Sequence, residues 1–327
     1  MDRKTRNGIS LLIVLALFVF SGAACPKRFS DTYATPTPVV LPENASFQDV
    51  ARVVNANAER IQQLQVSNGT LTTPGRPSLQ ASYAMDGKNR FRLTADAAFL
   101  GRQIDLGSND EIYWMWLQFD PSNSIYFGRH EEFYRSAARR VLPVPPQWLA
   151  EALGVVRFDP TGHHDGPVRR NPGQLEIRSI LLTPNGELER IATIDDRHGW
   201  VLQLQLFDRN STNQLLASAV ASDFNYYPEA GVFLPRTVQI QLPPADLQFT
   251  LQSERHMINQ LYADTAQLFS MPQPDGATPV NLNSISSPPP RYVEPQVQYA
   301  PAGDNRFRHP VQRHALRRLP PMSDRYR

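Results

Sequence analysis

Alternation of apolar and polar residues, at a period of two, dominates the chain between residues 65 and 254. This pattern is typical of strands that bury one face and leave the other face to solvent. It predicts two groups of strands, separated by a different pattern around residue 150. The predicted strands span residues 65–72, 78–85, 89–96, 100–106, 111–119, 124–128, 174–182, 187–194, 200–207, 214–226, 232–242 and 247–254.

Short turn sequences separate these strands. Asp86-Gly87, Pro121-Ser122-Asn123 and Asn185-Gly186 are examples, and their Gly and Asn residues tolerate the positive φ angles that tight hairpins need. Many strands joined by short turns, with few helices, predict a mainly β fold with a largely antiparallel sheet.

Apolar residues recur at three- and four-residue steps in residues 46–64, which predicts a helix. Ser46 and Asp49 are placed as a capping box at its start. We expect its apolar stripe to pack on the sheet rather than on a membrane. Between the two groups of strands we predict short helices at residues 131–141 and 147–153, followed by a loop at residues 157–173.

The N-terminus is typical of a secretory signal. Basic residues precede an apolar run from Ile9 to Phe20, and small residues then lead to Cys25. A run of about 12 apolar residues suits a signal core and is short of the roughly 20 that span a bilayer. Small residues before a lone cysteine match a bacterial lipobox, so we predict that Cys25 is lipidated and anchors the protein to a membrane. Gly22 stands where a lipobox usually has leucine, which leaves ordinary cleavage after Ala24 as the alternative.

Composition divides the rest of the chain. Residues 26–45 predict an extended tether, residues 46–282 a domain, and residues 283–327 a disordered tail rich in proline and arginine. The basic end of this tail suits contact with anionic lipid or cell-wall polymer, and a plain solubilising role is the alternative. The formal net charge of +2 argues neither for nor against a nucleic-acid partner, and we predict none. The single cysteine excludes an intramolecular disulfide and a cysteine-rich zinc site.

Few residues of the chain form motifs that are typical of catalysis or metal binding. No phosphate-binding glycine loop and no nucleophile elbow occurs in the sequence. The only metal-like cluster is His163-His164-Asp165, and neighbouring side chains on extended backbone point apart, so a solvated loop is favoured. Asp195-Asp196 is interpreted as part of a turn. We therefore expect no metal, no cofactor and no enzymatic activity.

Three motifs follow one another in the first group of strands. They are RFRL at residues 90–93, LG-x-x-x-DLGSND at residues 100–110 and Tyr-Trp-Met-Trp at residues 113–116. With Ile258-Asn259-Gln260, Phe269 and the Pro272-x-Pro274-Asp275-Gly276 run before Val280, they resemble the LolA/LolB-like family of bacterial lipoproteins and lipoprotein carriers. The resemblance covers residues 46–282. It implies a strongly curved antiparallel sheet forming a half-open barrel, plugged by an N-terminal helix and short internal helices, whose apolar concave face takes up acyl chains.

The candidate acyl-chain cavity is drawn from large apolar side chains on adjacent predicted strands and on one short helix. A groove lined by them would bind an acyl chain through burial, at about 25 cal/mol per Å² of apolar surface. The alternative is that the predicted helices fill this face entirely. The candidates are Phe91, Leu93, Phe99, Ile104, Leu106, Tyr113, Trp114, Met115, Trp116, Phe119, Tyr126, Phe127 and Trp148.

Two hypotheses follow. In the first, a monomeric lipoprotein anchored through Cys25 binds acyl chains of lipoproteins or lipids in the bacterial envelope, with its domain facing the periplasm and the outer membrane as the favoured anchor site. Gly87-Lys88 stands where carriers have an arginine-proline pair, which favours a tethered member over a shuttling one. In the second, a structural or interaction lipoprotein has a filled barrel, and its basic tail contacts polymer or anionic lipid.

Overall fold

The computed structural model describes residues 38–284 apart from residues 136–138, 140–141 and 211–212. Before residue 130 its strands are β1 (Gln63–Thr72), β2 (Leu79–Asp86), β3 (Arg90–Ala97), β4 (Gly101–Ser108), β5 (Ile112–Leu117) and β6 (Ser124–Arg129). After residue 160 they are β7 (His163–Asn171), β8 (Gln174–Thr183), β9 (Gly186–Asp195), β10 (Val201–Asp208), β11 (Gln214–Tyr227), β12 (Val232–Leu242), β13 (Leu247–Ser253), β14 (Met257–Ile258) and β15 (Thr278–Asn281).

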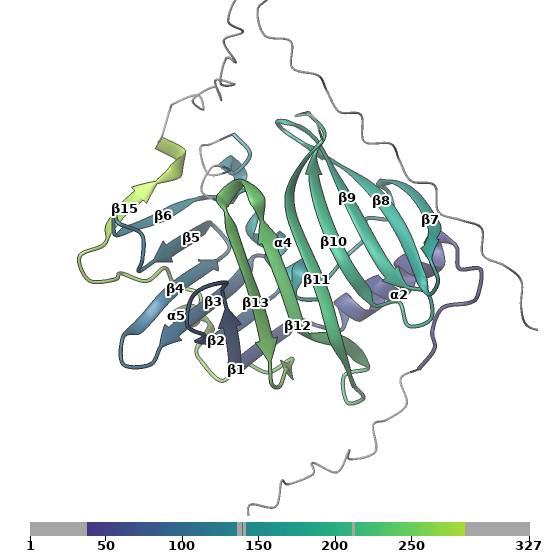
Figure 1. The fold of residues 1–327 in the computed structure, drawn as a ribbon, viewed down its shortest axis with the longest axis horizontal. Coiled ribbons are helices and arrows are strands. Elements are labelled where there is room, and N and C mark those ends of the chain that lie inside the picture. The colour runs from purple at the N-terminus through teal and green to yellow at the C-terminus, as the bar shows by residue number, and fades with distance from the viewer. Residues whose placement is uncertain (1–37, 136–138, 140–141, 211–212, 285–327) are drawn as a thin grey trace, which may run out of the picture. The chain divides into compact units, whose positions relative to one another are not determined.

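These strands form one large, curved and open sheet, as the sequence predicted (Figure 1). Its order is β15-β6-β5-β4-β3-β2-β1-β13-β12-β11-β10-β9-β8-β7, with β14 pairing beside β1. The pairs are antiparallel except for β15 with β6. Strand β13 pairs with β1, opposite Gly69 to Thr72, and this pairing joins the two groups of strands into one sheet. The mainly β class and the open, curved antiparallel sheet are confirmed.

Helix α2 (Phe47–Glu59) begins at the predicted capping box. The Ser46 hydroxyl accepts from the Asp49 backbone N–H at 3.2 Å, and the Asp49 carboxylate accepts from the Ser46 backbone N–H at 3.0 Å. The helix is shorter than predicted because β1 already begins at Gln63. Its apolar stripe packs on the sheet through Val50, Val54 and Ala58, as expected. In Figure 1 it crosses the second group of strands.

The other helical segments are short. They are α4 (Pro146–Ala152), α5 (Thr265–Leu268), η1 (His130–Glu132), η2 (Pro243–Ala245) and η3 (Leu282–Ser284). The predicted helix at residues 147–153 is therefore confirmed as α4, which begins with a proline in its first turn. The predicted helix at residues 131–141 lies partly outside the described residues, and its described beginning is the 3₁₀ turn η1.

The predicted loop at residues 157–173 is wrong in its second part, where the chain forms β7. This strand lies at the edge of the sheet and pairs only with β8. An edge strand can be charged on both faces, and Asp165, Pro167 and Arg169 erase the alternation by which a strand is recognised. The short strands β14 and β15 were missed because two and four residues are too few to show a period.

Side chains of alternating positions divide the sheet into two faces. The inner face is the one on which α2 and α4 pack, and it carries Leu64, Leu93 and Leu204 in one large core cluster. The outer face of β5 and β6 carries a second cluster around Trp114, Trp116 and Ile125, which Met271 and Ala277 cover. Leu41, within the predicted tether, is also buried against the core.

Candidate functional site

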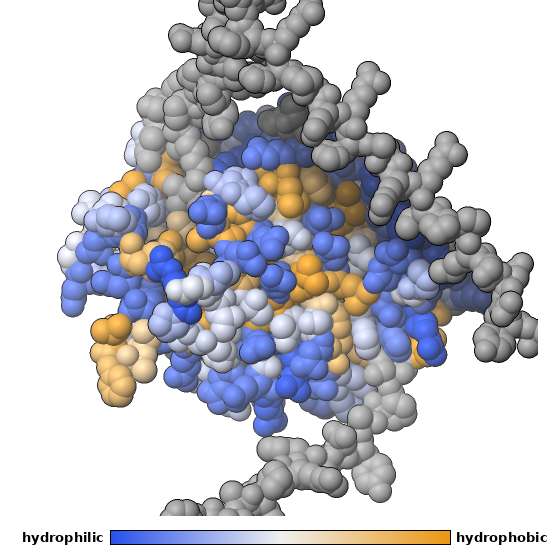
Figure 2. Space-filling model, viewed as in Figure 1, coloured by the Kyte–Doolittle hydropathy of each residue, from blue (hydrophilic) through white to orange (hydrophobic). Residues whose placement is uncertain are grey.

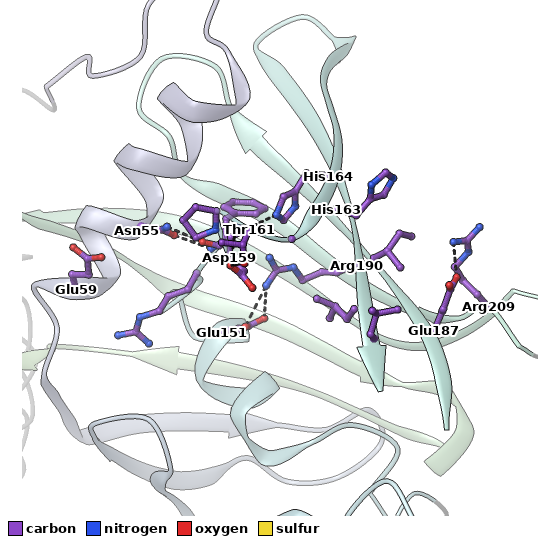
Figure 3. A pocket seen from close by; sticks show the side chains of 17 residues that line it. Asn55, Glu59, Glu151, Asp159, Thr161, His163, His164, Glu187, Arg190 and Arg209 are labelled. Carbon is purple, nitrogen blue, oxygen red and sulfur yellow. Dashed lines mark hydrogen bonds and ion pairs between the residues drawn. The ribbon is translucent and has the colours of Figure 1, made fainter. Parts of the chain in front are cut away.

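A groove with a volume of about 1160 Å³ opens between α2, the segment of residues 151–164 and strands β7 to β9 (Figure 3). Its apolar lining comes from Phe158, Pro160, Ile180, Leu181 and Leu182. Charged and polar side chains surround these residues, so the groove combines an apolar surface with a polar rim. Figure 2 shows the same mixture over the face in view, where apolar side chains lie between hydrophilic ones. The polar lining comprises Asn55, Glu59, Glu151, Arg157, Asp159, Thr161, His163, His164, Glu187, Arg190 and Arg209.

Helix α2 holds one wall of the groove in place. The Asn55 side chain donates to the Phe158 carbonyl and accepts from the Phe158 backbone N–H, each at 2.8 Å. The Arg157 guanidinium donates to the Ala58 carbonyl at 3.1 Å. These contacts satisfy backbone groups of an irregular segment and fix it along the helix. The Phe158 side chain is thereby placed in the groove wall, where it is almost fully buried.

His164 is a structural residue of this wall. Its Nε2 donates to the Asp159 carbonyl at 2.7 Å, which leaves Nδ1 to accept from the Ser179 hydroxyl at 2.8 Å in the neutral ring. The ring stacks on Phe47 with the centroids 4.4 Å apart. Hydrogen bonds from Thr161 to the Asp159 carboxylate lower the pKa of Asp159. Both His164 nitrogens are therefore occupied, while the neighbouring His163 is exposed.

Arg190 is the main charged residue of the groove interior. It lies on β9 among Leu188, Ala192 and Ile194, which are buried, alternate with more exposed residues and point to the inner face. Its side chain is 4% exposed, and its Nη1 lies 3.1 and 3.3 Å from the two carboxylate oxygens of Glu151 on α4. The guanidinium also lies over the Phe158 ring, 4.9 Å from its centroid.

This ion pair was not found by sequence reasoning. A signal was present, since Arg190 occupies a position where the alternation of β9 requires a buried residue. A buried charge is costly unless it is paired, so such a position predicts an acidic partner on whatever packs against the strand. The partner's position, Glu151, could not be deduced because α4 is distant in the sequence.

The mouth of the groove carries a second, more exposed ion pair. Arg209 donates to Glu187 at 3.0 Å, and their side chains are roughly half exposed. Leu182, at the end of β8, is 83% exposed beside this pair. The mouth therefore presents an apolar side chain to solvent next to charges that neutralise each other.

None of the predicted acyl-chain residues lines this groove. Among the described strands, alternation divides them between two faces, because the register pairs Leu106 with Met115 and places Trp114 opposite Phe127. The sequence pattern had treated the two faces of the segment at residues 112–119 as one surface. On the inner face lie Phe91, Leu93, Ile104, Leu106, Tyr113, Met115 and Tyr126, and on the outer face Trp114, Trp116 and Phe127.

The candidate acyl-chain residues also differ in exposure. Phe91, Leu93 and Ile104 pack with Trp148 of α4 in the large core cluster. Phe99 is fully exposed at the turn between β3 and β4, and Phe119 is 42% exposed beneath the Arg76 guanidinium. The structure thus brings part of the set together in a packed core and leaves two members on the surface. An acyl chain among these residues stays a prediction.

Two other features are absent from the described ranges. No group of three or more His, Cys, Asp or Glu side chains there could hold a metal ion. No helix in the same part of the chain is long and apolar enough to cross a membrane.

Comparison with known proteins gave structural likenesses only. No protein-family model matches the chain, and no curated protein matches its sequence. A LolA superfamily protein from Nitrosomonas europaea is similar at 9% identity and a TM-score of 0.42, over 68% of this chain and 97% of that one. A DUF1329 family protein from Desulfovibrio piger gives 8% identity and a TM-score of 0.45, over 68% and 96%.

A proposed outer membrane lipoprotein-sorting protein domain from Vibrio parahaemolyticus is similar at 10% identity and a TM-score of 0.43, over 67% of this chain and 95% of that one. The fold described above follows from the strand pairing of this chain itself.

Proposed function

We propose that this chain is a lipoprotein of the bacterial envelope that binds acyl chains of lipids or lipoproteins in the groove between α2 and strands β7 to β9. The observation that carries the proposal is the groove itself. Its volume of about 1160 Å³ is comparable to that of sites for small organic ligands, which are typically about 300–1,000 Å³. No covalent chemistry is involved, and affinity comes from burial of apolar surface.

The lining supports an amphiphile better than a wholly polar ligand. Leu181 gives apolar surface inside the groove, and Leu182 continues it to the mouth, while Phe158 is almost fully buried in the wall behind them. Charged side chains at the rim keep the empty groove hydrated, and they can contact the polar end of a ligand. In this proposal Cys25 carries the anchor, the domain faces the periplasm, and the chain acts as a monomer that receives acyl chains and passes them to a membrane.

Uptake of a pyrene-labelled acylglycerol by the full chain tests the proposal. Wild-type protein should bind the probe saturably, and Leu182→Glu should weaken binding because it places a charge on the apolar path into the groove. Val168→Glu is the matched control, since Val168 is also exposed, at 46%, and does not line the groove. Absence of saturable binding by wild-type protein, or equal weakening by both variants, would overturn the proposal.

A second candidate is an interaction lipoprotein whose interior is filled. The packing of Phe91, Leu93 and Trp148 in the core cluster favours it, because α4 already occupies the inner face over β3. In this case the groove holds no lipid and the basic tail makes the functional contact. Persistent failure to take up any acyl probe would favour this second function.

A further inference from the structure

The Arg190–Glu151 pair leaves hydrogen-bonding capacity unused inside the groove. A guanidinium has five N–H groups, and Glu151 receives only those of Nη1. Among the described residues, no acceptor meets the Arg190 Nε–H, which is buried, or the two N–H groups of Nη2. Buried donors without an acceptor are rare and costly in folded proteins. The interior of the groove therefore lacks an acceptor at this point.

The charges around Arg190 decide what kind of acceptor fits. Glu151 already neutralises the guanidinium, and both carboxylate oxygens contact it. Glu59, Asp159 and Glu187 also line the groove, together with Arg157 and Arg209, so its lining carries four carboxylates and three guanidinium groups. An anionic group would therefore add an uncompensated negative charge to a partly buried site, which is unfavourable. A neutral carbonyl oxygen accepts the hydrogen bonds without this cost.

We propose that the Nε–Nη2 edge of Arg190 recognises the carbonyl oxygen of a neutral acyl ester or amide whose hydrocarbon chain lies against Leu181 and Leu182. This inference rests on the proposed function and narrows it, because it selects acylated glycerol or an acylated amine over a free fatty acid. Figure 3 shows the arrangement: Arg190 reaches into the middle of the groove, close to Asp159 and Thr161, and Glu151 contacts its guanidinium from below. Binding requires that the Nε and Nη2 N–H groups face the ligand while Nη1 stays hydrogen-bonded to Glu151.

Arg190 positions the ligand through a hydrogen bond to the carbonyl group of the ligand. It sets specificity, while apolar burial supplies most of the affinity. Loss of a hydrogen bond to a charged donor typically changes affinity by about tenfold. The predicted preference is therefore for a carbonyl over an ether of the same chain length, by about that factor.

Calorimetric titration of the full chain with three matched probes tests the inference. 1-Monodecanoylglycerol has the ester carbonyl, 1-O-decylglycerol replaces it with an ether, and decanoate carries a charge. Wild-type protein should bind the ester about tenfold more tightly than the ether, and decanoate more weakly than the ester. Equal affinity for ester and ether, or tighter binding of decanoate, would overturn it.

Variants assign the preference to Arg190. Arg190→Lys keeps a positive charge beside Glu151 but removes the N–H groups of the Nε–Nη2 edge. The affinities for ester and ether should therefore converge to within about twofold, while the ether still binds. Arg178→Lys is the matched control on neighbouring β8: it is 41% exposed, pairs with Glu176 and does not line the groove. Retention of the full ester preference in Arg190→Lys would overturn the inference. If that variant does not fold, the double variant Arg190→Gln/Glu151→Gln, which removes both charges together, gives the same comparison.

The outcomes separate this inference from the proposed function. Equal binding of ester and ether removes the role of Arg190 and leaves acyl binding intact, whereas failure of both probes to bind removes both. N-decanoylserinamide distinguishes two sources of the carbonyl. If it binds like the ester, an N-acylated protein terminus fits the site; if it binds like the ether while the ester is preferred, acylglycerols do. The first result supports recognition of both kinds of carbonyl, and the second overturns the inference for amides.

Discussion

Arg92 on β3 and Asp105 on β4 form a buried ion pair with two parallel hydrogen bonds between neighbouring strands. The Arg92 Nε and Nη2 donate to the two Asp105 carboxylate oxygens at 3.2 and 2.8 Å. Asp105 is 1% exposed and also accepts from the Trp114 indole N–H at 2.9 Å and from Arg102 at 3.0 Å. These residues belong to the three motifs of the first group of strands. The motifs therefore meet in one polar cluster on the outer face, and that cluster supports the fold rather than lining the groove.

Removing the Asp105 charge should destabilise the protein. Asp105→Asn leaves the Arg92 guanidinium, whose side chain is 16% exposed, without its counter-charge, so the free energy of unfolding should fall by about 3–5 kcal/mol. Asp96→Asn is the control, because Asp96 pairs with Arg102 at a site where both side chains are about 40% exposed; it should cost at most about 1 kcal/mol. Urea unfolding followed by circular dichroism measures both. Similar losses for the two variants would contradict this role of the cluster.

Gly107 is required because the Trp114 indole lies directly over it. A Cβ on residue 107 would lie 2.2 Å from the ring, much closer than any real contact. Gly107→Ala should therefore destabilise by about 1–3 kcal/mol through overpacking. In a Trp114→Leu background the same alanine should cost clearly less, because the ring that it strikes is gone. Additive costs in this double-mutant cycle would show that the indole is not the reason for the glycine.

His256 makes the fold sensitive to acid. It lies buried between the Tyr83 and Tyr227 hydroxyls, at 3.0 Å from Nε2 and 2.8 Å from Nδ1, and burial, helped by the charge on Arg236, lowers its pKa to about 4. Because the unfolded chain binds the proton at about pH 6.5, this residue's contribution to stability is complete above that pH. It is lost as the pH falls from about 6.5 to about 4, by roughly 3 kcal/mol in total.

Urea unfolding at several pH values tests this expectation. His256→Gln cannot titrate, so its stability should change less than that of wild type between pH 6.5 and pH 4. Glutamine keeps a donor and an acceptor for the two tyrosine hydroxyls, which makes it the suitable replacement. Parallel pH profiles for wild type and variant would assign the acid sensitivity to other groups.

The proposed lipid anchor can be tested at a single residue, Cys25. Metabolic labelling with an alkyne analogue of palmitate should mark the wild-type protein, and Cys25→Ala should abolish the label because Cys25 is the only cysteine of the chain. Ser21→Ala leaves the cysteine in place and serves as the control. Equal labelling of wild type and Cys25→Ala would remove the anchor from the account.

The sequence predicted the strands well because a period of two survives wherever one face is buried. Each predicted strand has a counterpart in the structure, and the capping box at Ser46 and Asp49 forms as expected. Edge strand β7 escaped because charged residues and Pro167 hide its period. The pairing of β1 with β13 could not be deduced either, since it depends on contacts between residues about 180 positions apart.

The candidate site was harder to predict than the fold. Tyr113 and Trp114 are neighbours in sequence, yet strand geometry sends them to opposite faces of the sheet, so one apolar run contributes to two separate clusters. The groove forms where α2, the segment after α4 and the edge of the sheet meet, and its lining is mostly polar in sequence. Only the arrangement in space shows that Arg190 and Glu151 meet there.

Mass spectrometry of the full chain, purified from membranes without added lipid, tests the central claim most directly. If the groove binds acyl chains, neutral acylated species should accompany the wild-type protein, and their amount should fall in Leu182→Glu but persist in Val168→Glu. Wild-type protein that carries no acylated species, and that takes up none when they are supplied, would contradict the account.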